Sequence, residues 1–501
     1  MKQTFVFSHL TMWLATLTAA VVAASVLTAC GGGGGGGVDA NPSTSSPSTE
    51  MPTTTIPTTT PTPTISVTGP NRAVANTALN YSATVTNATA TAFDWLWSDG
   101  TANSSGGTTS KVWNAAGRFA GTVTATVSAQ PVSSLFVNQT VTVVAGPVSA
   151  GFGHTCAMTE SGGVRCWGGN SQGELGDGTL LSRTTSVAVT GLTDTVALSA
   201  GEFHTCALKS NGRAGCWGNN DSGQLGNGTK VNKSTPVAVE ALTNAVAIAA
   251  GYSYSCALKA NGTVACWGNN NNGQLGDGTI VDKSSPVTVA GLSNVVAIGV
   301  GNGHSCALKA DRSVACWGYN GAGQLGDGTT VDKTATVAVT GLTDATALSV
   351  GSDHTCVLRA SGSVACWGRN DDGQLGNGSV LNQAAPTAVL GLSDVKALSA
   401  GRYHTCVLRA NANVACWGYN DYGQVGDGST GVKKVTPVTV TGLQDAVAVS
   451  AGGFHSCALR TNGNLACWGY NADGQLGDGT SGTGTNKTMF TPVTGGAVFW
   501  Q

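Results

Sequence analysis

Charged residues are scarce in this sequence. Only 10% of its 501 residues are Asp, Glu, Lys or Arg, and the net charge is −2. A protein that holds nucleic acid electrostatically carries a basic patch, and neither such a patch nor an acidic tail is present. We therefore expect no nucleic-acid partner.

Catalytic motifs are also lacking. No nucleophile with an adjacent base, no phosphate-binding loop and no pair of catalytic carboxylates recurs or stands out. The sequence therefore predicts a protein that is not an enzyme and that uses no cofactor and no metal.

Glycine, in contrast, is abundant and periodic, with 72 residues. The last two-thirds of the chain hold seven copies of a unit of roughly 50 residues, and the second copy reads HTCALKSNGRAGCWGNNDSGQLGNGT from His204 to Thr229. A period of about 40–50 residues, with short apolar runs between Gly-rich turns, is typical of propeller blades rather than helical solenoids. We therefore expect ordered turns and an all-β ring.

Each copy carries one pair of cysteines. The pairs are Cys156 and Cys166, Cys206 and Cys216, Cys256 and Cys266, Cys306 and Cys316, Cys356 and Cys366, Cys406 and Cys416, and Cys457 and Cys467. The total is 15, so one cysteine, Cys30, remains outside the repeats. Such frequent use of cysteine suits an oxidising compartment outside the cytoplasm.

The second unit illustrates the four strands expected per blade: Val187–Val189, Val196–Ala200, Thr205–Lys209 and Arg213–Trp217. Asn211-Gly212 has the chemistry of a tight hairpin turn. Cys206 and Cys216 are equidistant from that turn, and cross-strand Cβ atoms lie about 4.5–5.5 Å apart, near disulfide distance. We expect each pair to form a disulfide between the two outer strands of its own blade.

Two metal readings compete with these assignments. His204 could join its two cysteines on zinc, but Tyr254 replaces the histidine in the third copy, and a fourth ligand is lacking. We expect the repeat histidines to form structural hydrogen bonds; they are His154, His204, His304, His354, His404 and His455. The recurrent aspartates could suggest calcium, but Asn227 and Asn377 take the same place in other copies. Turn chemistry is the preferred reading for them. These aspartates are Asp177, Asp277, Asp327, Asp427 and Asp478.

The repeated segments His-Thr/Ser-Cys-Ala/Val-Leu, Val-x-Cys-Trp-Gly-x-Asn and Gly-Gln-Leu-Gly-Asp-Gly-Thr resemble the regulator-of-chromosome-condensation repeat family in its bacterial, cysteine-paired form. The resemblance covers residues 147–497 and implies a seven-bladed β-propeller, similar in architecture to β-lactamase inhibitor protein II. We do not expect the guanine-nucleotide exchange known in nuclear members, because residues 1–30 are predicted to be an export signal and no exchange residue can be mapped onto this sequence.

The ends of the repeat array suggest how the ring closes. After the seventh copy, Phe490–Val493 matches the first strand of a unit. We expect this C-terminal strand to complete the blade begun by Val148–Trp167.

Residues 1–29 are predicted to be a lipoprotein signal peptide. Leu27-Thr28-Ala29-Cys30 resembles a bacterial lipobox, which implies cleavage before Cys30 and lipid on its sulfur; the alternative is an uncleaved membrane helix. Residues 30–64 form a Gly- and Pro/Thr-rich stalk. The expected location is the bacterial outer membrane or cell surface, with a lipid anchor in the membrane.

Residues 65–146 alternate apolar and polar residues, as the strands of a β-sandwich do. Phe93–Gly100 and Val112–Val127 resemble the polycystic-kidney-disease type of immunoglobulin-like domain, which implies a spacer. Trp95, Trp97 and Trp113 are expected to be core aromatics, the alternative being a platform for a ligand.

Topology nominates one end of the propeller for recognition. The Gly-x-x-His loops and the loops after Trp-Gly both open at that end, and their variable positions are rich in Tyr, Phe and Arg, which interface hot spots favour. The first set is Phe203, Tyr252, Arg402, Tyr403 and Phe454; the second is Tyr319, Arg369, Asp371, Tyr419, Tyr422 and Tyr470. The alternative is that these are scattered surface residues.

The preferred function is therefore a non-enzymatic, membrane-anchored binding scaffold outside the cytoplasm, expected to be a monomer. Its partner would be an unidentified protein or glycan. The alternatives are an inhibitor of a periplasmic or secreted hydrolase, resembling β-lactamase inhibitor protein II, and an adhesin or glycan-binding surface protein.

Overall fold

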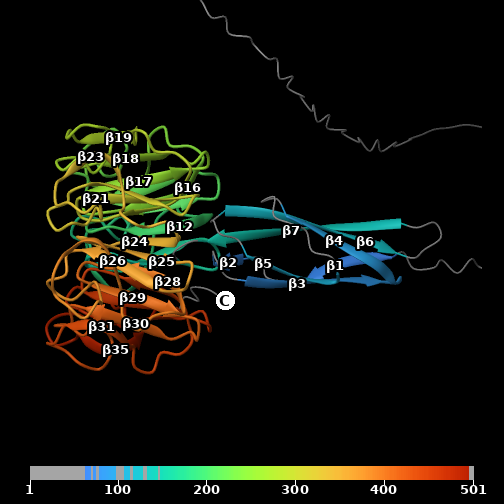
Figure 1. Cartoon of the computed structure of the whole chain (residues 1–501). Coiled ribbons are helices and arrows are strands. Elements are labelled where there is room, and N and C mark those ends of the chain that lie inside the picture. The colour runs from blue at the N-terminus through green and yellow to red at the C-terminus, as the bar shows by residue number, and fades with distance from the viewer. Residues whose placement is uncertain are drawn as a thin grey trace, which may run out of the picture. The chain divides into compact units, whose positions relative to one another are not determined.

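The computed structural model describes residues 63–68, 72–74, 78–97, 106–112, 117–127, 133–144 and 147–495. The predicted signal peptide, Cys30, the stalk up to residue 62, Trp113 and residues 496–501 lie outside the described residues. Where the chain is described, no helix has the length and hydrophobicity that a membrane crossing needs. Every regular element there is a β-strand (Figure 1).

The first seven strands form two sheets. One sheet has the order β1 (Thr64–Thr68), β3 (Ala78–Thr86), β5 (Thr108–Val112). The other has the order β2 (Arg72–Val74), β7 (Ser133–Val144), β6 (Gly117–Val127), β4 (Ala90–Trp97). All pairings are antiparallel except that of β2 with β7.

The two sheets share a small aromatic core. Trp95 and Trp97 are two residues apart on β4, so both point to the same face, where their rings stack with centroids 5.8 Å apart. The ring centroid of Tyr81, from β3, lies 5.2 Å from that of Trp97. Trp95 Nε1 donates a hydrogen bond to Gly106 O at 3.0 Å. Both tryptophans are at most 3% exposed. Burial of these two rings confirms that they are core residues and not a ligand platform.

Residues 147–495 form seven four-stranded sheets. The first consists of β8 (Val148–Ala150), β9 (His154–Met158), β10 (Val164–Gly168) and β11 (Arg183–Ala188). The second consists of β12 (Thr195–Ala200), β13 (His204–Lys209), β14 (Ala214–Gly218) and β15 (Lys233–Ala238). Figure 1 shows the following sheets in the colour order of the chain.

The remaining sheets repeat this pattern. The third has β16 (Ala245–Ala250), β17 (Tyr254–Lys259), β18 (Val264–Gly268) and β19 (Lys283–Thr288). The fourth has β20 (Val295–Val300), β21 (His304–Lys309), β22 (Val314–Gly318) and β23 (Lys333–Ala338). The fifth has β24 (Ala345–Val350), β25 (His354–Arg359), β26 (Val364–Gly368) and β27 (Gln383–Ala388). The sixth has β28 (Val395–Ala400), β29 (His404–Arg409), β30 (Val414–Gly418) and β31 (Lys434–Thr439), and the seventh has β32 (Ala446–Ala451), β33 (His455–Arg460), β34 (Leu465–Gly469) and β35 (Lys487–Pro492).

The sheet boundaries differ from those that the sequence predicts. Val187–Val189 is expected to open the second unit, and this is wrong, because β11 pairs with β10 at the outer edge of the first sheet. The Gly-rich loop after each Trp-Gly returns the chain to the sheet that it has just left. Each sheet therefore runs from a strand such as β12 to a strand such as β15.

The seven disulfides join the expected cysteines. They link Cys156 to Cys166, Cys206 to Cys216, Cys256 to Cys266, Cys306 to Cys316, Cys356 to Cys366, Cys406 to Cys416, and Cys457 to Cys467. The paired Cα atoms are 4.0–4.1 Å apart, and no repeat cysteine is more than 1% exposed. The predicted pairing within each copy is therefore confirmed.

The strands that these bonds connect differ from the expectation. Cys206 on β13 lies directly opposite Cys216 on β14, and these are the two inner strands of the sheet. The second cysteine of every other pair also lies on an inner strand, opposite its partner; these residues are Cys166, Cys266, Cys316, Cys366, Cys416 and Cys467. The expectation that outer strands are joined is wrong for all seven pairs, because it follows from the misplaced sheet boundary.

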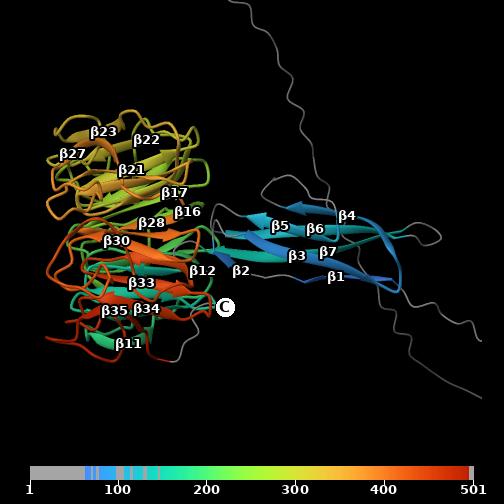
Figure 2. The same cartoon turned by 60° about the horizontal axis from the view of Figure 1, so that its bottom comes forward.

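The C-terminal strand does not complete the first sheet, contrary to the sequence prediction. β35 pairs with β34 in the seventh sheet, and β11 supplies the fourth strand of the first. The two sheets meet through loop contacts: Gly479 N donates to Thr184 O at 3.0 Å, and Trp167 Nε1 donates to Gln475 O at 2.9 Å. In Figure 2, green β11 accordingly lies beside red β34 and β35. Equivalent contacts join all the other pairs of neighbouring sheets, so the ring closes without exchanging a strand.

The repeat histidine is a buried hydrogen-bond donor between sheets. His204 Nε2 lies 2.9 Å from Ser255 Oγ of the next sheet, and Ser255 Oγ donates to Gln224 O at 3.0 Å. Since the serine has committed its only proton to the carbonyl, His204 Nε2 must carry the proton that it donates. The same relay occurs at His154, His304, His354, His404 and His455. The structural reading of these histidines is therefore confirmed.

A ring of backbone hydrogen bonds surrounds the axis. Gly151, at the end of β8, lies so close to the next sheet that a Cβ atom would be 2.6 Å from Gly201 O. The residue after this glycine donates its N–H across the seam, as Phe152 N does to Gly201 O at 3.2 Å. Backbone bonds from this position cross all seven seams and end with Gly453 N donating to Gly151 O at 2.9 Å. Glycine is needed here because any side chain would separate neighbouring sheets.

Candidate functional site

Both kinds of variable loop open at one end of the ring, as the sequence predicts. In the second sheet, Gly218 pairs with His204, and Asn219 N donates to Phe203 O at 2.8 Å, so the second loop begins beside the first. The cysteine hairpin turns lie at the opposite strand ends. Pro147 O, just before β8, accepts from Met158 N at 2.9 Å, so the chain enters the ring at the hairpin end. We call the end with the variable loops the loop face.

Buried asparagines hold the long loops in shape. Asn270 Nδ2 donates to Thr279 O at 3.0 Å, and Asn270 Oδ1 accepts from Leu275 N at 2.9 Å. Asp277 accepts from Thr279 N and Oγ1 at 3.0 and 2.7 Å and pairs with Lys283 Nζ at 3.5 Å. These bonds keep the pKa of Asp277 below its usual value, against the opposing effect of burial. The turn reading of the recurrent aspartates accounts for their contacts.

Eight aromatic side chains form a continuous arc on the loop face. In spatial order they are Tyr252, Phe203, Phe152, Phe454, Tyr403, Tyr419, Tyr422 and Tyr470. Successive ring centroids are 4.7–6.2 Å apart. The arc passes over five sheets, from the third back to the first and on to the seventh and sixth. We call these eight residues the aromatic arc.

Two arginines complete this surface. Arg402 lies over the rings of Phe152 and Tyr403, with its Cζ 4.8 and 5.1 Å from the two centroids. Arg369 Cζ lies 5.2 Å from the Tyr403 ring, and its Nε donates to Asp371 at 2.9 Å. Stacking of the arginines on the rings restrains both kinds of side chain, so the surface is already ordered before a partner binds.

Tyr319 is the predicted residue that the structure places apart from the arc. It lies 39% exposed beside a groove of about 510 Å³, together with Asn272, Asn302, Asp353 and Arg369. Burial raises the pKa of Asp353, and the nearby arginines oppose this effect. Tyr319 is thus near Arg369 and Asp371 but contributes to a more polar part of the loop face.

Phe152 and Glu202 belong to the site, although the sequence does not single them out. In each repeat one glycine lies beside the axis, as Gly151 does in the first, and we call it the axial glycine. Phe152 and Glu202 directly follow the axial glycine of their repeats, as Tyr252 and Arg402 do in theirs. The signal for Phe152 is therefore present in the repeat alignment. Glu202 gives no such signal, because its partner Arg402 is 200 residues away in the sequence.

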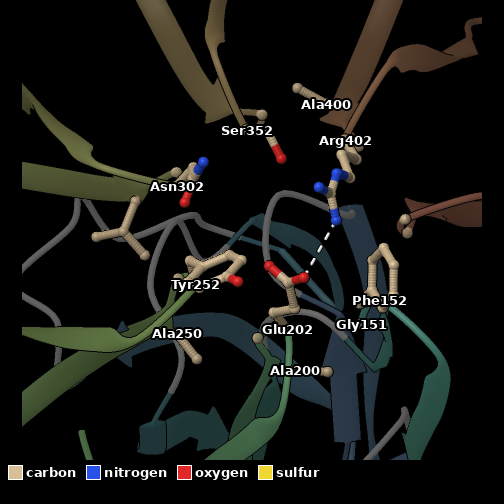
Figure 3. A pocket seen from close by; sticks show the side chains of 18 of the residues that line it. Gly151, Phe152, Ala200, Glu202, Ala250, Tyr252, Asn302, Ser352, Ala400 and Arg402 are labelled. Atoms are coloured by element: carbon tan, nitrogen blue, oxygen red, sulfur yellow. Dashed lines mark hydrogen bonds and ion pairs between the residues drawn. The ribbon is translucent and has the colours of Figure 1, made fainter. Parts of the chain in front are cut away.

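A pocket opens on the loop face at the axis of the ring. It has a volume of about 120 Å³ and is surrounded by the axial glycines and the residues that follow them. Figure 3 shows Glu202, Tyr252, Asn302 and Ser352 around this space, with Arg402 reaching from the opposite side toward Glu202. Their atoms Arg402 Nη1 and Glu202 Oε1 are 3.1 Å apart.

The carboxylate of Glu202 is poorly solvated. Burial raises its pKa to about 7, even though the positive charge and hydrogen bond of Arg402 act in the opposite direction. Only 11% of the Glu202 side chain is exposed. The axial pocket therefore holds the hydrogen-bonded pair of Glu202 and Arg402 at the centre of the loop face. In the described part of the chain, no three His, Cys, Asp or Glu residues form a group that could hold a metal ion.

Sequence comparison identifies two regions of the ring. Residues 182–499 match the family described as RCC1-like domain, and residues 148–174 match the regulator of chromosome condensation (RCC1) repeat. Among curated proteins, none matches the chain.

Solved structures share the fold. Yeast RCC1 (Prp20), in a structure with Kap60, has 22% identity and a TM-score of 0.60, over 70% of this chain and 85% of the matched one. Prp20p from Saccharomyces cerevisiae has 23% identity and a TM-score of 0.59, over 69% and 87%. Human WBSCR16 has 20% identity and a TM-score of 0.59, over 66% and 93%. At these identities the likeness establishes the fold alone, a propeller of repeated four-stranded sheets.

Proposed function

Since this chain belongs to the RCC1-like domain family, we propose that its propeller is a non-enzymatic scaffold that binds a protein partner through the loop face. The observation that carries the proposal is the aromatic arc with its two stacked arginines. Tyr, Trp and Arg supply much of the binding energy in protein interfaces. The surrounding loops are held by buried hydrogen bonds, so little order has to be gained on binding.

The contrast between constant and variable positions supports this role. Positions that join the sheets, such as His204 and Trp217, recur in nearly every copy. Positions on the loop face differ from copy to copy: those after the axial glycine are Phe152, Glu202, Tyr252, Asn302, Ser352, Arg402 and Gly453. A rigid frame thus presents six different side chains and one glycine to one space.

Replacing Tyr403, Tyr419 and Tyr470 together with alanine is expected to weaken partner binding by at least about 2 kcal/mol, the scale of interface hot spots. The partner can be captured by a photo-crosslinking residue at position 421 of the full chain and identified by mass spectrometry. The melting temperature should change little, since the buried asparagine and tryptophan contacts of the loops remain.

The matched control is Lys209→Ala with Asn211→Ala, on the hairpin end of the ring. This variant should bind the captured partner as the wild type does. Unchanged binding in the tyrosine variant, with loss in the hairpin variant, would show that the loop face is not the recognition surface. Loss of binding only when residues 65–146 are deleted would transfer recognition to the first two sheets.

A glycan is the second candidate partner, favoured by the groove beside Tyr319. The groove combines an exposed aromatic ring with planar polar side chains, Asn272, Asn302 and Asp353 among them. A third candidate function is inhibition of a periplasmic or secreted hydrolase. The crosslinking experiment distinguishes these functions, since an inhibitor would capture a hydrolase and a glycan binder would capture glycosylated material.

The location that we propose is the bacterial outer membrane or cell surface, with the chain anchored through lipid on Cys30. Support comes from the lipobox-like Leu27–Cys30 and from seven buried disulfides, which form readily only in oxidising compartments. The proposed stalk and an immunoglobulin-like spacer over residues 65–146 would carry the propeller, as a monomer, away from the membrane.

Metabolic labelling with a palmitate analogue should mark the wild-type chain and leave Cys30→Ala unlabelled. A transmembrane helix without lipid would give no label in either chain. Equal labelling of both chains would place the acyl group elsewhere and contradict the proposed anchor.

A further inference from the structure

The axial pocket has the size of one side chain. Its volume is about 120 Å³, whereas pockets for drug-sized ligands measure roughly 300–1,000 Å³. A nucleotide, a sugar chain or a cofactor is therefore too large, and the tip of one long side chain fits.

The backbone of the pocket offers nothing to an anion. Seven N–H groups surround the axis, and each is committed to a carbonyl of the next sheet, as Glu202 N is to Gly251 O at 3.1 Å and Arg402 N to Gly452 O at 3.1 Å. Anion sites built from backbone need N–H groups that point at the ligand. The positive charge of Arg402 is paired with Glu202, and its guanidinium lies over the rings of Phe152 and Tyr403.

A cation, in contrast, finds an acceptor that is not fully satisfied. Within the described residues, Arg402 is the one hydrogen-bond donor to the Glu202 carboxylate. A carboxylate can accept several hydrogen bonds, and the raised pKa of Glu202 reflects the missing solvation. The Asn302 amide oxygen and the Ser352 hydroxyl lie on the same rim, and Tyr252 and Phe152 provide ring faces. Ring faces attract cations.

We propose that the axial pocket is the anchor point of the loop face and takes one basic side chain, lysine or arginine, from a protein partner. Glu202 is its counter-ion, and Tyr252 and Phe152 form its aromatic walls. In the unbound protein Arg402 pairs with the Glu202 carboxylate, so it competes with the incoming cation. The identity of this side chain deepens the proposed function and rests on it, but the site can be tested without the partner.

The experiment titrates the full chain in detergent with n-butylguanidinium, a small probe for such a side chain, by saturation-transfer NMR. We expect saturable binding in the millimolar range. Glu202→Gln should weaken it about tenfold or more. Arg402→Gln should strengthen it several-fold, because the internal competitor is removed. Lys209→Ala, on the hairpin end of the ring, should bind the probe as the wild type does.

Opposite results would overturn the proposal. Binding of n-pentanoate in place of n-butylguanidinium, with loss in Arg402→Gln, would make the pocket an anion site. Absence of cation binding in a chain with wild-type melting temperature would show that the pocket takes no basic group. If that occurs while the triple tyrosine variant still loses its partner, only the anchor is wrong. If n-butylguanidinium binds while the tyrosine variant keeps its partner, only the proposed role of the arc is wrong.

Discussion

Acidification from pH 7 to about pH 4 is expected to unfold the propeller through its buried histidines. Burial lowers the pKa of His204, His304, His354, His404 and His455 from 6.5 to about 3 and that of His154 to about 4. The folded state keeps these rings neutral, whereas the unfolded chain takes up protons below pH 6.5. Their contribution is therefore present in full above pH 6.5 and is lost as the pH falls toward 3–4.

The expected effect is large because the groups act together. Each contributes roughly 1.4 kcal/mol per pH unit between its two pKa values, so six give about 8 kcal/mol per unit. A domain is stable by only about 5–15 kcal/mol. Aspartates with lowered pKa, such as Asp277, act in the same direction, and Glu202 with its raised pKa acts in the other. Denaturant midpoints measured from pH 8 to pH 4 would show the slope.

The third repeat supplies a matched control for this prediction. Tyr254 stands where other copies have histidine, and its hydroxyl donates to His304 O and contacts Ser305 of the next sheet. His404 also faces a serine, Ser456. His404→Tyr should therefore fold and reduce the pH slope by about one-sixth, or one proton. A denaturant midpoint that stays constant between pH 7 and pH 4.5 would show that the histidines are not kept neutral by the fold.

Reduction of all seven disulfides is the second change with a large expected effect. Each bond closes a loop with a sequence separation of 10 residues. Chain entropy assigns such a loop about 3 kcal/mol, and seven independent loops about 20 kcal/mol. Because the cysteines are buried, we expect slow reduction of the folded protein, rapid reduction in denaturant, and no refolding until the thiols are oxidised again.

The double variant Cys206→Ala with Cys216→Ala separates the effect of one bond from that of the set. It should lose about 3 kcal/mol of stability and keep its fold. Peptide mapping without reductant should link Cys206 to Cys216 and never to Cys256. Free thiols in the protein isolated under non-reducing conditions, stoichiometric zinc, or refolding of the fully reduced chain would contradict the prediction.

The regular features of the fold were accessible from the sequence because they recur. The spacing of Cys206 and Cys216 about Asn211-Gly212 predicts the hairpin and its bond, and the topology of one unit predicts that both loops open at the same end. The boundary between units was not accessible in the same way. A repeat has no beginning that its sequence marks, so Val187–Val189 fits the start of one sheet as well as the end of another. Two errors, the strands joined by disulfides and the closing strand, share that single cause.

The site was accessible in part. Tyr403, Tyr419, Tyr422 and Tyr470 follow from the positions of variable residues within each copy, since a ring brings equal positions together. The pairing of Glu202 with Arg402 depends on which copies face each other across the axis. That relation is set by the closure of the ring and not by any local pattern. Tyr319 shows the converse, because a shared position in the repeat does not ensure a shared neighbourhood.

The axial ring of backbone hydrogen bonds separates the residues that hold the sheets together from the residues that line the pocket. The glycines and the N–H groups beside them join sheet to sheet through the backbone alone, so six of the seven seams do not depend on the side chain that follows the glycine. At the last seam Gly453 is itself required, because a Cβ atom there would lie 2.8 Å from Phe152 O. The other side chains can change without altering the seam, and only Glu202 and Arg402, which pair across the pocket, depend on each other. A single substitution after one of these glycines changes one of the seven positions around the pocket, and an exchange of whole copies would change their order around the ring. New binding specificities can therefore arise by single substitutions that leave the backbone ring intact.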